Sequence, residues 1–228
     1  MNELNQVKPI HIAVILDGNR RFAKNQGLST YKGHEFGAKN VDNFLNWCKE
    51  LNIKEITLYC LSTENLKRDK VELKFLFKLF KNWFKKIQKD KRIHEDKIKI
   101  RFIGDLSLVP KDIKQLALKI EQETKKYNNY IINFCFSYGG RLELINAIKK
   151  LKHKEEITEQ NITNSLWLSS EPDLIIRTGN QIRTSNFLPW QSVYSEWFFI
   201  EKMWPEFTKQ DLINILEEFK KRKRNFGK

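Results

Sequence analysis

Short apolar runs alternate with amphipathic stretches along the whole chain. The apolar runs predict six strands, at His11–Leu16, Glu55–Leu61, Lys97–Ile103, Tyr130–Phe136, Asp173–Arg177 and Glu196–Ile200. The stretches between them predict helices at Arg20–Asn25, Phe36–Leu51, Val71–Lys89, Lys111–Lys126, Arg141–Leu151 and Lys209–Lys223. Strands that alternate with helices indicate an α/β fold, with a six-stranded, mainly parallel sheet flanked by helices.

The chain shows no obvious division into domains. No linker rich in proline, glycine or serine interrupts it, and no segment repeats. The charged stretch Lys152–Gln160 is expected to be a surface loop and is only a weak candidate for a boundary. The 228 residues are therefore expected to form a single domain, 1–228.

The helix expected at Val71–Lys89 has two distinct faces. Its apolar residues recur at steps of three and four, at Leu73, Leu76, Phe80, Trp83 and Ile87. Lysines occupy a separate face. The stripe fits a helix packed on the core, the wall of an apolar channel, or a helix resting on a membrane surface. Periodicity alone does not separate these interpretations.

Composition narrows the setting of the protein. The three cysteines are scattered singly, which predicts reduced, buried thiols in a cytoplasmic protein and no zinc site. No signal peptide is recognisable, and no apolar stretch approaches the roughly 20 residues of a membrane span. The net charge of +14 is compatible with nucleic acid, a membrane surface or anionic small substrates.

Polar residues collect directly after four of the expected strands. The clusters are Asp17–Arg21, Ser62–Asn65 with Arg68, Ser137–Arg141, and Arg177–Gly179 with Arg183–Asn186. Parallel strands end at the same edge of a sheet, where ligands of open α/β folds bind. We therefore expect these four clusters to lie together.

Their chemistry predicts a diphosphate site. Four arginines could form bidentate bonds to phosphate oxygens: Arg21, Arg68, Arg177 and Arg183. Gly18 permits a tight turn into a helix, and the hydroxyls of Ser62 and Ser185 could donate to the same oxygens. Asp17 and Glu196 are carboxylates that could bind Mg²⁺. A nucleoside-triphosphatase P-loop is absent from the sequence, and so are the adjacent aspartates of the all-helical prenyl synthases.

Five segments, in order, resemble the motifs of the cis-prenyltransferases, the undecaprenyl and dehydrodolichyl diphosphate synthase family. They are His11–Ala23, Gly33–Gly37, Thr57–Asn65, Tyr138–Arg141, and Asp173–Gly179 continued by Ser185–Gln191 and Glu196. The double arginine after Asn19 is more similar to archaeal and eukaryotic members. The resemblance spans nearly the whole chain.

The resemblance implies a homodimeric Mg²⁺-dependent enzyme with an apolar tunnel between sheet and helices. It would condense isopentenyl diphosphate in cis onto farnesyl or geranylgeranyl diphosphate, giving a polyprenyl lipid-carrier precursor for glycosylation or cell-envelope synthesis. Contact with a membrane surface is compatible with such a product, and nucleic acid is not an expected partner. Asp17 would be catalytic and bind Mg²⁺ with the help of Glu196.

The other site residues are also carried over from the resemblance. The allylic diphosphate would be bound by Gly18, Asn19, Arg20, Arg21 and His34. Isopentenyl diphosphate would be bound by Arg177, Arg183 and Ser185. Ser62, Glu64, Asn65 and Arg68 would lie between the two substrates, with Asn65 as a second catalytic residue involved in proton removal. Phe22, Thr63, Leu66 and Thr184 complete the expected substrate-binding set.

Several positions depart from the family pattern. Thr30 stands where an arginine often contacts the allylic diphosphate, and Leu66 replaces a common aromatic residue. The C-terminal Arg-x-Gly motif reads Asn225-Phe226-Gly227, with Arg224 one residue early. Two alternatives stay open: a non-catalytic subunit of a heteromeric prenyltransferase, which is expected to lose the Asp-Gly-Asn motif kept here, and a basic nucleic-acid-binding module.

Overall fold

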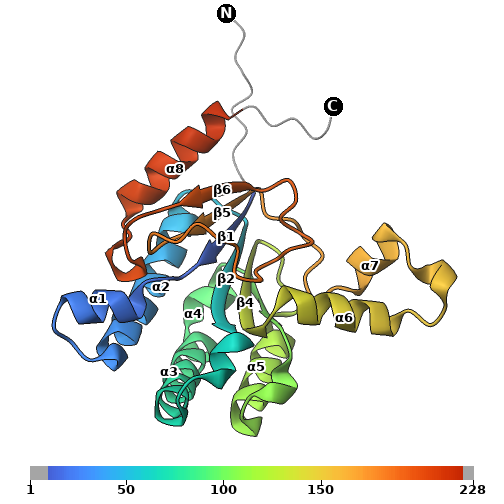
Figure 1. Cartoon of the computed structure of the whole chain (residues 1–228), viewed down its shortest axis with the longest axis horizontal. Helices are drawn as coiled ribbons and strands as arrows, with labels where there is room; N and C mark the ends of the chain where they lie inside the picture. The colour runs from blue at the N-terminus through green and yellow to red at the C-terminus, as the bar shows by residue number, and fades with distance from the viewer. Residues whose placement is uncertain (1–9, 223–228) are drawn as a thin grey trace, which may run out of the picture.

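A computed structural model of the chain describes residues 10–222, which form one six-stranded sheet between helices (Figure 1). The strands are β1 (His11–Ile15), β2 (Glu55–Ser62), β3 (Ile98–Ile103), β4 (Tyr130–Tyr138), β5 (Leu174–Arg177) and β6 (Glu196–Phe199). Their order is β3-β4-β2-β1-β5-β6, and every neighbouring pair is parallel. The expected α/β fold is confirmed, and the sheet is wholly parallel.

Helices and loops cover both faces of this sheet. The helices are α1 (Asn19–Asn25), α2 (Thr30–Glu50), α3 (Lys70–Lys89), α4 (Lys91–Glu95), α5 (Lys111–Thr124), α6 (Gly140–Lys150), α7 (Glu159–Ser165) and α8 (Lys209–Lys221). Short 3₁₀ turns lie at Glu64–Lys67 (η1), Leu106–Leu108 (η2), Lys154–Glu156 (η3) and Trp204–Glu206 (η4). Helices α2, α3, α5 and α8 pack on one face, where they share the larger apolar core.

Alternation along β1 shows how the two cores are divided. Ile12 and Val14 point into the larger core, whereas Ala13 and Ile15 point into a smaller one on the opposite face. The smaller core also contains Tyr138 of β4. Buried on both sides, the central strands read as continuous apolar runs, which is why their positions could be predicted.

Some boundaries differ from expectation. Helix α2 begins at Thr30, six residues before Phe36, and includes Gly33, where a Cβ atom would lie 2.1 Å from the Asn19 carbonyl oxygen. The expected loop Lys152–Gln160 contains η3 and the first residues of α7, which Thr158 caps by accepting from the Asn161 N–H. Helix α4 was not expected. Residues 223–228, which include Arg224 and the Asn225-Phe226-Gly227 motif, lie outside the described part of the chain.

The described residues bear on two compositional expectations. Cys48 and Cys135 are buried and unpaired, and burial raises the pKa of both thiols, so they remain protonated. Within residues 10–222, no helix combines the length and the apolar character that crossing a bilayer requires.

Candidate active site

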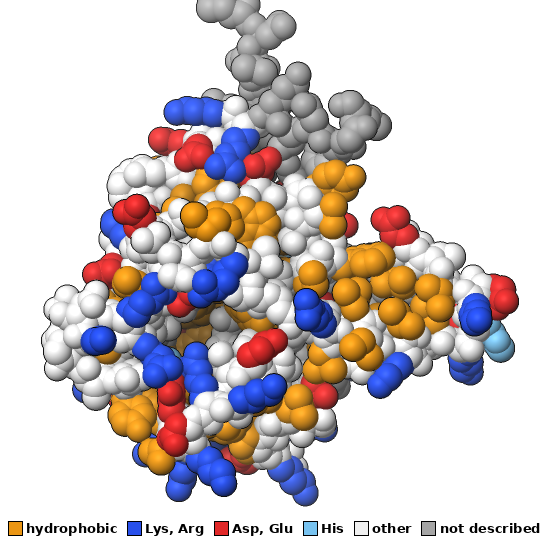
Figure 2. Space-filling view, in the orientation of Figure 1, with side chains coloured by type: hydrophobic (Ala, Val, Ile, Leu, Met, Phe, Trp, Pro, Cys, Tyr) orange, Lys and Arg blue, Asp and Glu red, His pale blue; other side chains and the backbone are white. Residues whose placement is uncertain are grey.

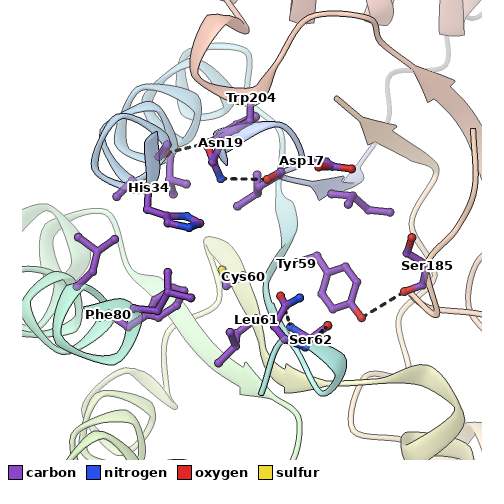
Figure 3. Close-up of a pocket in the computed structure, with 18 of the residues that line it drawn as sticks. Asp17, Asn19, His34, Tyr59, Cys60, Leu61, Ser62, Phe80, Ser185 and Trp204 are labelled. Carbon is purple, nitrogen blue, oxygen red and sulfur yellow. Dashed lines mark hydrogen bonds between the residues drawn. The ribbon is translucent and has the colours of Figure 1, made fainter. Parts of the chain in front are cut away.

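The turn after β1 holds Asp17 at the carboxyl edge of the sheet. Gly18 has a φ of 109°, and a Cβ atom there would lie 2.7 Å from the sulfur of Met203, so only glycine fits the turn. The Asp17 carbonyl accepts hydrogen bonds from Thr178 Oγ1 (2.7 Å) and the Trp204 N–H (2.9 Å). These contacts fix the backbone and leave the Asp17 carboxylate free to face the site (Figure 3).

Two arginines hold the Asp17 carboxylate. Arg21, one turn into α1, donates to Oδ1 at 3.1 Å, and Arg177, at the end of β5, donates to Oδ2 at 2.9 Å. The Arg177 side chain is only 4% exposed, and its Nη1 also donates to Ser185 Oγ (2.7 Å) and to the Arg183 carbonyl. Its Nε has no hydrogen-bond partner among the described residues. The guanidinium is thus held in place through its two Nη atoms.

The loop that carries Ser185 has an unusual backbone. Ser185, Asn186 and Leu188 all have positive φ, at 49°, 61° and 48°. This left-handed conformation costs free energy at non-glycine residues and tends to cluster at functional sites. Arg183 and Thr184 in the same loop are exposed, so their side chains are accessible to a ligand from solvent.

Ser62 and Asn65 form a reciprocal pair at the end of β2. The Asn65 N–H donates to Ser62 Oγ (3.1 Å), and the Ser62 N–H donates to Asn65 Oδ1 (3.2 Å). Glu64 beside them accepts from Asn186 at 3.0 Å. Partial burial raises the pKa of Glu64, but hydrogen bonds that include those from Asn186 and Thr63 outweigh it and lower this pKa overall. The turn is thus fastened to the opposite loop.

Glu72 of α3 gathers three basic groups that the sequence placed far apart. Its Oε1 lies 3.1 Å from Arg68 Nη1, 3.4 Å from His34 Nε2 and 3.9 Å from Arg20 Nε. Burial lowers the pKa of His34, and the nearby Arg68 and Arg20 act in the same direction against the Glu72 contact. His34 is therefore neutral at pH 7, and its one ring N–H donates to the Glu72 carboxylate.

Two connected hollows surround these residues, and Figure 2 shows basic side chains around the opening. A cavity of about 560 Å³, here called the cleft, runs from Asp17 to Leu76, Phe80 and Trp83 of α3. A second hollow of about 710 Å³, the basic pocket, shares Asp17 with it and is lined by polar and basic side chains. One end of the site suits a polyanion, and the other suits a hydrocarbon.

Most of the expected site residues meet in these hollows. The cleft is lined by Asp17, Asn19, His34, Ser62, Glu64, Asn65, Arg68, Arg177 and Ser185. The basic pocket is lined by Asp17, Gly18, Asn19, Arg20, Arg21, His34 and Arg68. Neither lining includes Phe22, Thr63, Leu66, Arg183 or Thr184. Phe22 instead packs edge-on against Phe36, with ring centroids 5.5 Å apart.

Glu196 lies elsewhere. It begins β6 and pairs in register with Leu174, the first residue of β5. Asp17 lies at the other edge of the sheet, two residues beyond Ile15, the last residue of β1. Its carboxylate accepts from Arg222 at 2.9 Å. Within one chain, the structure does not bring Glu196 to Asp17, and the role of Glu196 as a metal ligand stays a prediction.

Three residues of the site were not among the expected ones: Lys24 and Trp204 line the hollows, and Glu72 contacts Arg68, which lines both. Glu72 could have been noticed as an isolated acid at the start of a lysine-rich helix. Lys24 lies one turn after Arg20 on α1 and so shares its face. Trp204 is fully buried and donates from its indole N–H to the Gly37 carbonyl (2.8 Å), which nothing local in the sequence indicates.

Comparisons with known proteins agree with this geometry. The family model for undecaprenyl diphosphate synthase matches residues 15–227. Tritrans,polycis-undecaprenyl-diphosphate synthases (geranylgeranyl-diphosphate specific) from Pyrococcus abyssi and Pyrobaculum aerophilum are each 42% identical to the chain. The alignments cover 97% of this chain and 88% of the first relative, and 96% of both chains for the second.

Solved structures give the same result. Lavandulyl diphosphate synthase from Lavandula x intermedia, in complex with dimethylallyl diphosphate, superposes with a TM-score of 0.92 at 28% identity, covering 98% of this chain and 100% of that one. A probable undecaprenyl diphosphate synthase from Campylobacter jejuni superposes with a TM-score of 0.82 at 35% identity over the whole of both chains. The resemblance seen in the five motifs is confirmed: the chain belongs to the undecaprenyl diphosphate synthase family of cis-prenyltransferases.

Proposed function

We propose that the chain condenses isopentenyl diphosphate in cis onto an allylic prenyl diphosphate, giving a polyprenyl diphosphate that serves as a lipid-carrier precursor. The observation that carries this proposal is the position of the Asp17 carboxylate. It lies between Arg21 and Arg177 where the basic pocket meets the apolar cleft. Geranylgeranyl diphosphate is the proposed primer, because the archaeal relatives are named for it.

The allylic diphosphate would occupy the basic pocket. Arg20, Arg21 and Arg68 supply charged donors there, and His34 lines the pocket beside them. Thr30 lines the same pocket and contributes no charge, whereas Lys24 adds an ammonium group within it. We propose that Lys24 supplies the positive charge missing at position 30.

Isopentenyl diphosphate would bind at the ends of β5 and the following loop. Arg177 lines the cleft and is fixed by Asp17 and Ser185. Arg183 is exposed in a loop of left-handed backbone and could turn its guanidinium to the same diphosphate. Arg177 would therefore orient the substrate, and Arg183 would close over it.

The reaction breaks the allylic carbon–oxygen bond, forms a carbon–carbon bond to the isopentenyl unit, and releases a proton and diphosphate. Negative charge develops on the leaving diphosphate, and the arginines of the basic pocket stabilise it there. A carboxamide is not a base at neutral pH. The Oδ1 of Asn65 is taken by the Ser62 N–H, so Asn65 would guide proton removal through its NH₂ group.

Mg²⁺ fits the donor set in one specific way. Within residues 10–222, no three His, Cys, Asp or Glu side chains converge on a metal site. Mg²⁺ commonly binds one or two protein carboxylates and completes its coordination with substrate phosphates and water. Asp17 would supply that carboxylate, and the ion would neutralise charge on the diphosphates.

The wall formed by α3 would receive the growing chain. Leu76, Leu79, Phe80 and Trp83 line the cleft. Burial of hydrocarbon contributes roughly 0.8 kcal/mol per CH₂, so each added isoprene unit gains by entering it. Of the original stripe, Leu73 and Ile87 do not line the cleft. Ile87 is buried in the larger core instead.

We also propose that the chain works as a homodimer. Figure 2 shows apolar side chains gathered over α6 and α7, and Ile145 and Ile148 of α6 are 50% and 42% exposed. Exposed apolar patches of this kind mark interaction surfaces. The proposed assembly is cytoplasmic, with the chain as one domain that contacts a membrane peripherally.

Incubation with labelled isopentenyl diphosphate, geranylgeranyl diphosphate and Mg²⁺ tests the function. We expect labelled polyprenyl diphosphate that vanishes with EDTA and is strongly reduced in Asp17→Asn. Farnesyl diphosphate in a parallel reaction tests the primer. No chain extension with either primer, from folded protein with Mg²⁺ present, would refute the proposed activity.

A further inference from the structure

Helix α3 has a second face that turns away from the cleft. Lys74 and Lys78 lie on this face and are exposed. They border a groove of about 570 Å³ between α3 and the start of α5, here called the α3–α5 groove. The groove shares no lining residue with the cleft or the basic pocket. It is therefore a separate surface feature of the same helix.

The floor of the groove is apolar and aromatic. Phe75, Phe77 and Ile113 line it, and Tyr31 of α2 packs against Phe75 with ring centroids 4.6 Å apart. Val71 at its edge is 64% exposed. Single exposed apolar residues are common, but a contiguous apolar floor with an exposed edge marks an interaction surface.

The lining of the groove carries more lysines than acids. Among residues 10–222, no carboxylate lies within ion-pair distance of Lys74 or Lys78, whereas Lys81 pairs with Asp112 at 2.5 Å. Figure 2 shows further basic side chains along the lower margin of the molecule, where α3 and α5 end in Figure 1. An apolar floor with unpaired ammonium groups is complementary to a surface that is anionic outside and apolar beneath.

We propose that the α3–α5 groove docks on an anionic lipid bilayer. Lys74 and Lys78 would contact lipid phosphates, while Val71 and Tyr31 reach the boundary between headgroups and acyl chains, where tyrosine is favoured. The choice of a bilayer over a protein partner rests on the proposed function, since a polyprenyl product needs an apolar destination. Helix α3 is the wall that separates this groove from the cleft.

Vesicle sedimentation of the full chain without substrates tests the proposal. Wild type is expected to bind vesicles of equal parts phosphatidylglycerol and phosphatidylcholine, and to bind less as salt rises. The double variant Lys74→Gln/Lys78→Gln is expected to bind about thirtyfold more weakly, because each basic residue near an anionic membrane contributes roughly fivefold. Val71→Asp is also expected to weaken binding, and an acidic residue suits the first turn of α3.

A matched double variant on α8 controls for net charge. Lys220→Gln/Lys221→Gln removes the same charge at the other end of the molecule, and we expect it to bind within about twofold of wild type (Figure 1). Equal losses in both double variants would overturn the proposal. So would absence of wild-type binding, or equal binding to pure phosphatidylcholine.

Prenyl transfer measured in detergent separates this proposal from the proposed function. None of the substituted residues lines the cleft or the basic pocket, so activity with detergent-solubilised substrates is expected to be unchanged in every variant. A wild-type protein that binds vesicles but transfers no prenyl group would refute the function and leave the docking surface intact. A variant that lost activity along with vesicle binding would show that the groove is part of the catalytic fold, against the proposal.

Discussion

Replacing Asp17 with alanine removes the carboxylate that Arg21 and Arg177 share at the centre of the site. The change breaks contacts of 2.9 Å to Arg177 and 3.1 Å to Arg21. We expect two separable losses, one in stability and one in turnover, because Arg177 is buried and Asp17 also lines both the cleft and the basic pocket.

The stability loss follows from the burial of Arg177. Removing one partner of a fully buried ion pair typically costs about 3–5 kcal/mol. The Asp17 side chain is 30% exposed, so solvent screening reduces this to about 1–2 kcal/mol. For a chain of this size, that corresponds to a fall of about 2–8 °C in the melting temperature. The protein is therefore expected to remain folded at 25 °C.

The activity loss is expected to be much larger. Asp17 is proposed to hold the Mg²⁺ that neutralises negative charge on the leaving diphosphate. Loss of such charge stabilisation costs about 3–4 kcal/mol, or a factor of roughly 100 to 1,000 in turnover. Asp17→Asn is the matched control, because it keeps the size of the side chain and can accept one arginine hydrogen bond. We expect the Asp17→Asn variant to melt closer to wild type and still lose most of its turnover.

Calorimetry and incorporation of labelled isopentenyl diphosphate measure the two losses separately. Turnover is best measured at least ten degrees below the lower of the two melting temperatures, so that both proteins are folded during the assay. Near-normal turnover in folded Asp17→Ala would remove this residue from the mechanism. A loss fully explained by the unfolded fraction would do the same.

Three further predictions concern other parts of the chain. Arg183→Ala is expected to raise KM for isopentenyl diphosphate far more than KM for the allylic primer, with partial rescue by Arg183→Lys, because lysine lacks the bidentate fork; equal effects on both constants would contradict the site assignment. Among folded variants Phe80→Ala and Trp83→Ala, at least one is expected to lengthen the product by whole isoprene units, as measured by chromatography. Ile87→Ala lies in the core and is the control: it costs about 2–5 kcal/mol of stability without changing product length. Burial lowers the pKa of His11 despite the opposing Glu55, so the unfolded chain binds the proton more readily than the folded chain. The free energy of unfolding is therefore expected to fall as pH drops below about 6.5. The His11→Gln variant is expected to show a smaller fall.

The sequence located the strands well for a physical reason. Parallel strands covered on both sides have no polar face, so runs such as Tyr130–Phe136 stand out against the charged helices. The same argument fails at the end of β4, where Ser137 and Tyr138 continue the strand although they are polar. Tyr138 is nonetheless buried, because its hydroxyl donates to Glu143 at 2.6 Å.

The site was predicted through the edge at which parallel strands end. That rule places Asp17, Asn65 and Arg177 together without any knowledge of the helices. It says nothing about Glu72, which contacts Arg68 from α3. Nor does it apply to Glu196, which lies at the beginning of its strand and so at the other edge of the sheet. Contacts between layers depend on how helices are positioned over the sheet, and a single sequence carries little information about that.

Two glycines of α2 allow α1 to lie close against it. A Cβ atom on Gly33 would lie 2.1 Å from the Asn19 carbonyl oxygen, and one on Gly37 would lie 2.2 Å from Asn19 Oδ1. Alanine at position 33 would push the backbone next to the turn that carries Asp17, and alanine at position 37 would displace the Asn19 side chain, which donates to the Leu16 carbonyl at 3.2 Å. Redesign of this enzyme for other primers or product lengths can therefore vary cleft-lining residues of α3 such as Phe80 and Trp83 one at a time, whereas α1 and α2 must be kept as one unit. The least tolerant positions of that unit are two that have no side chain at all.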